Sequence, residues 1–143
     1  MSEIFHKILV ATDGSENSRM AAAEAIKIAR AMGSALYALY VVDMSVLTSA
    51  TVGEEEAFIY KTLESEGKKA LDQIKSTANG ISVDARVIEG KPASAIVDFA
   101  EKNGIDLIVV GSQGKSKIES LLLGSVADRI IRTAKCPVLV VKS

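Results

Sequence analysis

Short apolar runs recur along the chain and alternate with stretches in which apolar residues fall three or four positions apart. Nearly continuous apolar runs of this length are typical of strands that are covered on both faces, which favours a parallel sheet. Five such runs, most of them dense in β-branched and large apolar side chains, lie at residues 7–12, 35–42, 82–88, 106–110 and 138–142.

The segments between these runs have helical signals. Gly33 follows the first of them as a helix stop, and Pro92 suits the first turn of the third. Gly67 interrupts the second at a cost of about 1 kcal/mol relative to alanine. The predicted helices lie at residues 16–32, 55–79, 93–103 and 126–133.

Strands that alternate with helices predict an α/β fold, a single doubly wound five-stranded parallel sheet with helices on both faces. Neither a linker nor an internal repeat interrupts the pattern, so we expect one domain over residues 1–143. Five strands favour an order in which the first and fourth strands are neighbours and the connections reverse between them. Ligands of open sheets bind at such a reversal, beyond the carboxyl ends of the strands.

A glycine-rich segment follows the fourth predicted strand. Gly111, Gly114 and Gly124 have the spacing G-x2-G-x9-G, and Ser125 follows at the start of a predicted helix. Glycine permits positive φ and a close approach of the backbone to a ligand, while the unpaired N–H groups of a helix start attract anions. Ser125 and Asp128 also form an S-x-x-D capping pattern. The segment predicts a phosphate site, with helix capping as a further role of Ser125.

The turn Asp13-Gly14-Ser15 after the first strand should reach the same crevice. Asp13 can accept hydrogen bonds from two vicinal hydroxyls, as acidic residues do for ribose in dinucleotide folds. It can equally serve as a turn residue that helps to start the helix at Ser15. The adjacent glycine segment favours ribose. In the second strand, the backbone of Val41 could pair with an adenine edge or belong only to the core.

Composition narrows the class of protein. Lys and Arg number 17 against 18 acidic residues, so no global positive field would gather nucleic acid or an anionic membrane. Cys136 is the lone cysteine and has no internal disulfide partner, which fits a reducing compartment. No apolar run approaches the roughly 18 residues of a membrane span. We therefore expect a cytoplasmic protein with neither nucleic acid nor membrane as a partner.

Residues suited to catalysis are few. Gly114-Lys115-Ser116 imitates the end of a Walker A motif, but Val109 stands where that motif has its first glycine. His6 is the only histidine and precedes the first strand, at the edge opposite the crevice, so no Ser-His-Asp triad is available there. We assign no catalytic residue and no metal ligand, and we treat weak ATP hydrolysis as an adjunct at most.

Three motifs occur in order along the chain: KILVATDGS, the G-x2-G-x9-G-S signature and CPVLVVK. With these motifs the chain resembles the universal stress protein family over essentially its whole length. The resemblance implies a strand order of 3-2-1-4-5 and the binding of ATP, AMP or another adenine nucleotide, with Mg²⁺ as an optional companion of ATP. It implies Asp13 on the ribose and the Val41 backbone on adenine. It also implies phosphate-binding and lining residues: Gly111, Gly114, Gly124 and Ser125 around the phosphates, with Thr12 and Val126 beside them.

Ala11 departs from the family pattern, because a number of nucleotide-binding relatives have proline at this position. The departure leaves the conformation of the turn after the first strand open. The resemblance also implies a homodimer through the last strand. The residues of that strand agree, because a predicted sheet edge without inward charges favours a partner. They are Val138, Leu139, Val140 and Val141.

The leading hypothesis is an adenine-nucleotide-binding regulator or sensor in the stress response, whose protein target the sequence does not identify. Two alternatives stay open. One is a slow Mg²⁺-dependent ATP hydrolase, or a phosphoryl- or nucleotidyl-transfer enzyme of the same fold group. The other is a structural dimer whose glycine segment is only a turn.

Overall fold

The five strands form one parallel sheet of order β3-β2-β1-β4-β5, as the sequence predicts. The computed structural model describes residues 4–43, 53–113 and 123–143. In that part of the chain, no helix combines the length and the apolar character needed to cross a membrane. The elements in chain order are β1 (Lys7–Thr12), α1 (Glu16–Met32), β2 (Ala35–Asp43), α2 (Glu54–Thr77), β3 (Val83–Gly90), α3 (Pro92–Lys102), β4 (Leu107–Gly111), α4 (Ser125–Thr133) and β5 (Val138–Val141).

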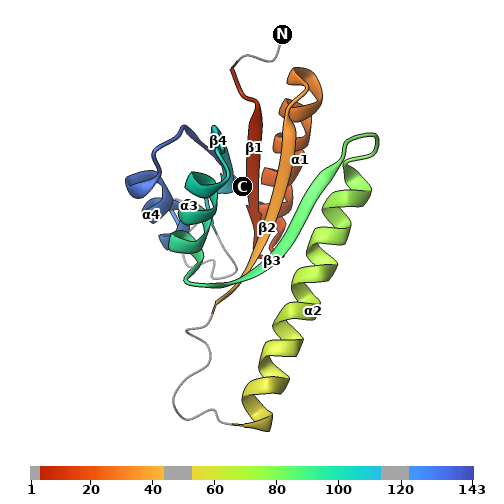
Figure 1. Ribbon diagram of the computed structural model, residues 1–143, viewed down its shortest axis with the longest axis vertical. Helices are drawn as coiled ribbons and strands as arrows, with labels where there is room; N and C mark the ends of the chain where they lie inside the picture. Colours follow the sequence, from red (N-terminus) through yellow and green to blue (C-terminus); the bar gives the residue numbers. More distant parts are fainter. Residues whose placement is uncertain (1–3, 44–52, 114–122) are drawn as a thin grey trace.

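The central strands are buried on both faces, which explains their continuous apolar runs. Ile8 and Val10 of β1 pack on the side of the sheet covered by α1 and α2, whereas Leu9 packs on the side covered by α3 and α4. Figure 1 shows these two helix pairs on opposite sides of the strands. Successive side chains of a strand point to opposite faces, so a strand covered twice needs apolar residues throughout.

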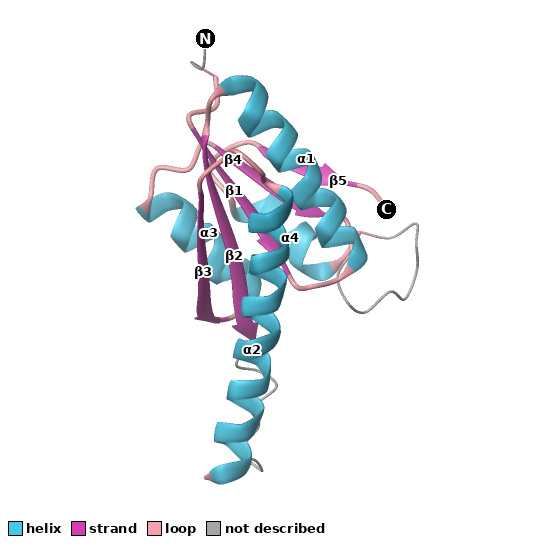
Figure 2. Cartoon of the chain, turned by 90° about the vertical axis from the view of Figure 1, so that its right-hand side faces the viewer, coloured by secondary structure: helices cyan, strands magenta, loops and turns pink. Residues whose placement is uncertain are grey.

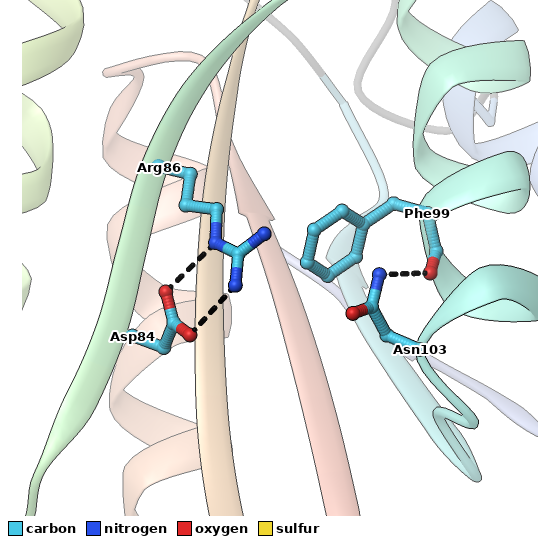
Figure 3. Close-up of polar contacts among 4 residues, drawn as sticks. All are labelled: Asp84, Arg86, Phe99 and Asn103. Carbon is cyan, nitrogen blue, oxygen red and sulfur yellow. Dashed lines mark hydrogen bonds and ion pairs between the residues drawn. The ribbon is translucent and has the colours of Figure 1, made fainter.

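The edge strand β3 carries charge on its less covered face. Asp84 accepts two hydrogen bonds from Arg86, at 2.9 and 3.0 Å (Figure 3). The Arg86 guanidinium also lies 5.3 Å from the ring centroid of Phe99 in α3, a cation–π contact. Asn103 donates to the Phe99 carbonyl at 2.9 Å. The bonds with Arg86 hold the pKa of Asp84 below its ordinary value. This cluster joins α3 to the edge of the sheet.

Helix α2 is longer than the strands that it covers. Leu71 and Ile74 of its C-terminal half are buried. Its N-terminal half extends past the carboxyl ends of β2 and β3 (Figure 2), and Phe58 there is 71% exposed. A Cβ atom on Gly67 would lie 2.6 Å from Cδ1 of the buried Tyr40 ring. Gly67 therefore makes room for a core aromatic side chain.

Candidate functional site

The loops after β1 and β4 leave the sheet side by side. These strands pair in parallel with Val10 opposite Val109. Asp13 and Ser112 each follow three residues later, and neighbouring strands are about 4.8 Å apart. The segments that the sequence singled out therefore begin at one crevice, where the direction of the connections reverses.

The turn after β1 is built from short polar side chains. The buried Thr12 hydroxyl accepts a hydrogen bond from the Gly14 N–H at 3.1 Å and lies 2.9 Å from the Ser18 hydroxyl. Oδ1 of Asp13 accepts from the Ser15 N–H at 2.9 Å. Asp13 therefore acts as a turn residue at the start of α1, which is one of the two roles that the sequence leaves open. Each carboxylate oxygen has two lone pairs, so further hydrogen bonds to a ligand are compatible with that role.

Strand β2 runs past the end of β1. The ladder between them ends where Thr12 pairs with Tyr40, so Val41 is the first residue beyond it. Val41 is half-buried and stays paired with Ile88 of β3. Ala11 is an ordinary member of the β1–β2 ladder, so the strand continues without interruption through this position.

The two ends of the glycine segment meet at its base. The Ser112 carbonyl accepts a hydrogen bond from the Gly124 N–H at 2.6 Å, and the Ser112 N–H donates to the Val141 carbonyl at 2.9 Å. Because α4 begins at the next residue, Ser125, its N-terminus lies at the carboxyl edge of the sheet. Gly114 of the predicted phosphate motif lies outside the described residues, as do Lys115 and Ser116 of the Walker A near-match.

The start of α4 differs from the predicted capping pattern. Gly124 is the N-cap residue, with φ −65° and ψ 156°, and Ser125 is the first helical residue. The Asp128 N–H donates to the Gly124 carbonyl at 2.9 Å and the Asp128 carboxylate pairs with Arg132 at 3.0 Å, so the S-x-x-D box with Ser125 as its N-cap does not form. Within the described residues no side chain caps this helix. Its first-turn N–H groups have no intrahelical partners, as at every helix start.

Neither Gly111 nor Gly124 has a positive φ, which corrects the sequence interpretation. Gly124 has a negative φ, and Gly111 does not adopt the left-handed region either. A Cβ atom on Gly111 would lie 2.6 Å from Oδ1 of Asn17 and 3.1 Å from its carbonyl oxygen. The packing of β4 against α1 therefore requires glycine at position 111.

Asn17 is the residue that sequence reasoning missed. It is fully buried, with 0% of its surface exposed. Its Oδ1 accepts a hydrogen bond from the Gln113 N–H at 2.7 Å, and its Nδ2 donates to the Val141 carbonyl at 3.1 Å. A signal for this burial exists in the sequence, because Asn17 precedes Ala21 by four residues on the face of α1 that packs in the core.

The opposite edge of the sheet lacks this arrangement. The His6 N–H donates to Asp106 there at 2.9 Å, which places the only histidine where the sequence predicts it. A cavity of about 140 Å³ at this edge is lined in part by Ile105, Ala134 and Cys136. Burial raises the pKa of the Cys136 thiol, so it is neutral near pH 7 and a weak nucleophile.

Comparison with known proteins identifies the family. The model of the universal stress protein family matches residues 4–142. The chain belongs to the universal stress protein family. It is 45% identical over 141 residues to universal stress protein MJ0531 of Methanocaldococcus jannaschii, covering 97% of this chain and 83% of that one. It is 34% identical over 148 residues to universal stress protein YxiE of Bacillus subtilis, covering 97% and 100%.

Solved universal stress protein structures have the same fold. The structure of protein MJ0577, from Methanocaldococcus jannaschii, matches with a TM-score of 0.83 at 33% identity, covering 98% of this chain and 97% of that one. A universal stress protein crystallised in complex with cAMP matches with a TM-score of 0.70 at 31% identity, covering 97% and 98%. Both likenesses span nearly the whole chain, including the carboxyl edge of the sheet.

Proposed function

We propose that this universal stress protein binds an adenine nucleotide, ATP or AMP, as one nucleotide-binding domain over residues 1–143. One observation carries the proposal. The hydrogen bond between Ser112 and Gly124 holds the start of α4 at the edge where β1 ends and Asp13 follows. A carboxylate suits ribose hydroxyls, and a helix N-terminus suits phosphate. The similar protein in complex with cAMP supports an adenine nucleotide as the ligand class.

Each part of the nucleotide has a chemically suitable group in this proposal. Asp13 accepts hydrogen bonds from the ribose hydroxyls, and the backbone of Val41 pairs with the adenine edge. The exposed Ser125 hydroxyl and the first amides of α4 donate to the phosphates. The remaining proposed contacts come from Thr12, Gly111, Gly114, Gly124 and Val126.

Energetics decide which contacts the ligand needs. Micromolar affinity corresponds to about 8 kcal/mol. A hydrogen bond to a charged group contributes about 1.5–3 kcal/mol, so two or three phosphate contacts give about 3–9 kcal/mol, and the entropic cost of association leaves a net value below that total. Ribose and adenine must supply the rest, which is why the proposal includes Asp13 and Val41. We propose Mg²⁺ binding only together with ATP.

The proposed role is that of a cytoplasmic regulator or sensor in the stress response. Nucleotide occupancy would bias the loops at the carboxyl edge and thereby the surface offered to a protein partner. Membership of the family supports this role, whereas the residues of the site support the binding chemistry.

Isothermal titration calorimetry with AMP, ATP and GTP tests the binding. We expect micromolar binding of at least one adenine nucleotide and weaker binding of GTP. Asp13→Asn should raise the dissociation constant about tenfold or more, because a charged acceptor is lost. The amide oxygen can still accept from the Ser15 N–H, so the turn should survive.

Asp106→Asn is the matched control. The Asp106 carboxylate also accepts hydrogen bonds from backbone N–H groups, at 2.9 and 3.1 Å, but at the opposite edge of the sheet. Its substitution should leave nucleotide affinity unchanged. No heat with any of the three nucleotides, on folded protein, would remove the proposal. An equal loss of affinity in Asp106→Asn would show that Asp13 has no particular role.

We also propose that two copies pair through β5. This strand lies at the edge of the sheet, and Leu139 in it is 37% exposed. An apolar edge strand presents unpaired N–H and C=O groups, and antiparallel pairing with a second copy would satisfy them. The paired strands would bury the four residues of the edge: Val138, Leu139, Val140 and Val141.

A further inference from the structure

We propose that Asn17 is a positioning residue that couples the nucleotide site to strand β5. The inference rests on the proposed nucleotide binding and adds a route by which occupancy of the site reaches the sheet edge. It stands on the hydrogen bonds of one buried side chain that joins the first turn of α1, the base of the glycine segment and the end of β5.

The Asn17 carboxamide connects two backbone segments that are distant in sequence. Its oxygen accepts from the Gln113 N–H at 2.7 Å and lies 3.4 Å from the Ser112 hydroxyl. Its nitrogen donates to the Val141 carbonyl at 3.1 Å. That carbonyl also accepts from the Ser112 N–H at 2.9 Å. The base of the glycine segment and the last residue of β5 thus share both a direct and an indirect link.

Few other side chains can replace Asn17. The position is fully buried, and it requires one donor and one acceptor on the same short side chain. A buried N–H or C=O group that loses its partner is costly, so both bonds must be kept together. Gly111 lies so close to Asn17 that a Cβ atom added to the glycine would contact it. This leaves no space for a longer side chain at position 17.

The same contacts reach the proposed phosphate site. Ser112 holds the Gly124 N–H at the start of α4 and also contacts Val141. A nucleotide that fixes the start of α4 therefore favours one position of the Ser112–Gln113 backbone. Asn17 then favours one position of Val141. Coupling between two sites needs such an element with contacts to both, and the coupling is reciprocal.

Two substitutions separate the two hydrogen bonds of Asn17. We call the bond to Gln113 the loop arm and the bond to Val141 the β5 arm. Asn17→Asp, studied at pH 8, keeps an oxygen for the Gln113 N–H but places a carboxylate oxygen against the Val141 carbonyl, which breaks only the β5 arm. The helix start favours the charged carboxylate. Asn17→Ala removes both arms. Asn103→Ala is the control, because it removes another side-chain amide that donates to a backbone carbonyl, that of Phe99 at 2.9 Å, at the opposite edge of the sheet.

The experiment combines calorimetry with hydrogen exchange of the C-terminal peptide, residues 138–143, with and without saturating AMP or ATP. In the wild-type protein the nucleotide should slow exchange of this peptide by about fivefold or more, the lower range of measured couplings. Asn17→Asp should bind the nucleotide within about threefold of wild type, or about 0.7 kcal/mol, yet show clearly less slowing, because only the direct bond from the Ser112 N–H to Val141 remains. Asn17→Ala should bind about tenfold more weakly and also show clearly less slowing, whereas Asn103→Ala should behave as wild type.

Two outcomes overturn the coupling while leaving nucleotide binding intact. One is calorimetric binding by wild type with unchanged exchange in residues 138–143. The other is full slowing in Asn17→Asp. An absence of binding heat for wild type with both AMP and ATP removes the proposed function and this inference together. The calorimetric signal distinguishes that failure from the first two.

Discussion

At the scale of single residues, the carboxyl edge depends on one close approach. Gly111 ends β4 directly against Asn17, and a Cβ atom at position 111 would lie 2.6 Å from the Asn17 side-chain oxygen. Protein interiors are packed too densely to absorb such an overlap without movement of the backbone. Any side chain at this position must therefore displace α1 or the glycine segment, both of which border the proposed site.

Gly111→Ala should lower the free energy of unfolding by about 1–3 kcal/mol, as overpacking in a core does. Urea denaturation measures this loss. A double-mutant cycle supplies the control, because Asn17→Ala removes the oxygen that the new methyl group meets. We expect Gly111→Ala to cost less in the Asn17→Ala background. An equal cost in both backgrounds would mean that the contact with Asn17 is unimportant.

At this scale the sequence predicted where Asp13 lies, but it did not predict the start of α4 or the role of Asn17. Asp13 could be assigned to the crevice because its position after β1 follows from topology. The cap predicted at Ser125 was wrong by one residue, because the Asp128 N–H bonds to the Gly124 carbonyl and makes Gly124 the N-cap. Asn17 was missed because its partners at Gln113 and Val141 are 96 and 124 residues away in the chain.

At the scale of elements, boundaries set by local signals were predictable and those set by pairing were not. Helix α1 has the predicted bounds because Ser15 caps its start and Gly33, with φ 70°, ends it. Strands β3 and β4 continue to Gly90 and Gly111, beyond their predicted ends, because their neighbours extend the ladder. Register between strands leaves no local trace in the sequence.

Helix α2 offers a test in which local propensity and packing predict opposite signs. Propensity alone says that Gly67→Ala should stabilise the protein by about 1 kcal/mol. The buried Tyr40 ring blocks the new methyl group, so we expect a destabilisation of about 1–3 kcal/mol instead. Thermal and urea unfolding measure the sign. Ser65→Ala, on the exposed side of the same helix, is the control and should change stability little. A more stable Gly67→Ala variant would refute the packing argument.

At the scale of the whole molecule, strand order makes one edge of the sheet special. The alternation of elements predicted that β1 and β4 are neighbours, and the resemblance to the family predicted the full order. That order brings the loops after β1 and β4 together. The same order leaves β3 and β5 at the two ends of the sheet. Charged residues mark the exposed face of β3, whereas β5 is apolar, so a second copy is expected only at β5.

Substitution of Leu139 by arginine tests this assembly. We expect the wild-type protein to be a dimer at micromolar concentration, and Leu139→Arg to raise the dimer dissociation constant about tenfold or more. Sedimentation equilibrium measures both. Phe58→Arg is the control, because it removes another exposed apolar side chain, one that lies on the projecting half of α2. A monomeric wild type, or an unaffected Leu139→Arg dimer, would contradict pairing through β5.

The most direct test of nucleotide binding at the carboxyl edge is a titration of ¹⁵N-labelled protein with AMP, followed by amide chemical shifts. Binding at the proposed site predicts the largest shifts at Asp13, at residues 111–113 and at residues 124–126. Amides at the opposite edge, such as those of Ile105 and Cys136, should stay unchanged. Shifts concentrated at that opposite edge, or no saturable shift at all, would contradict the account.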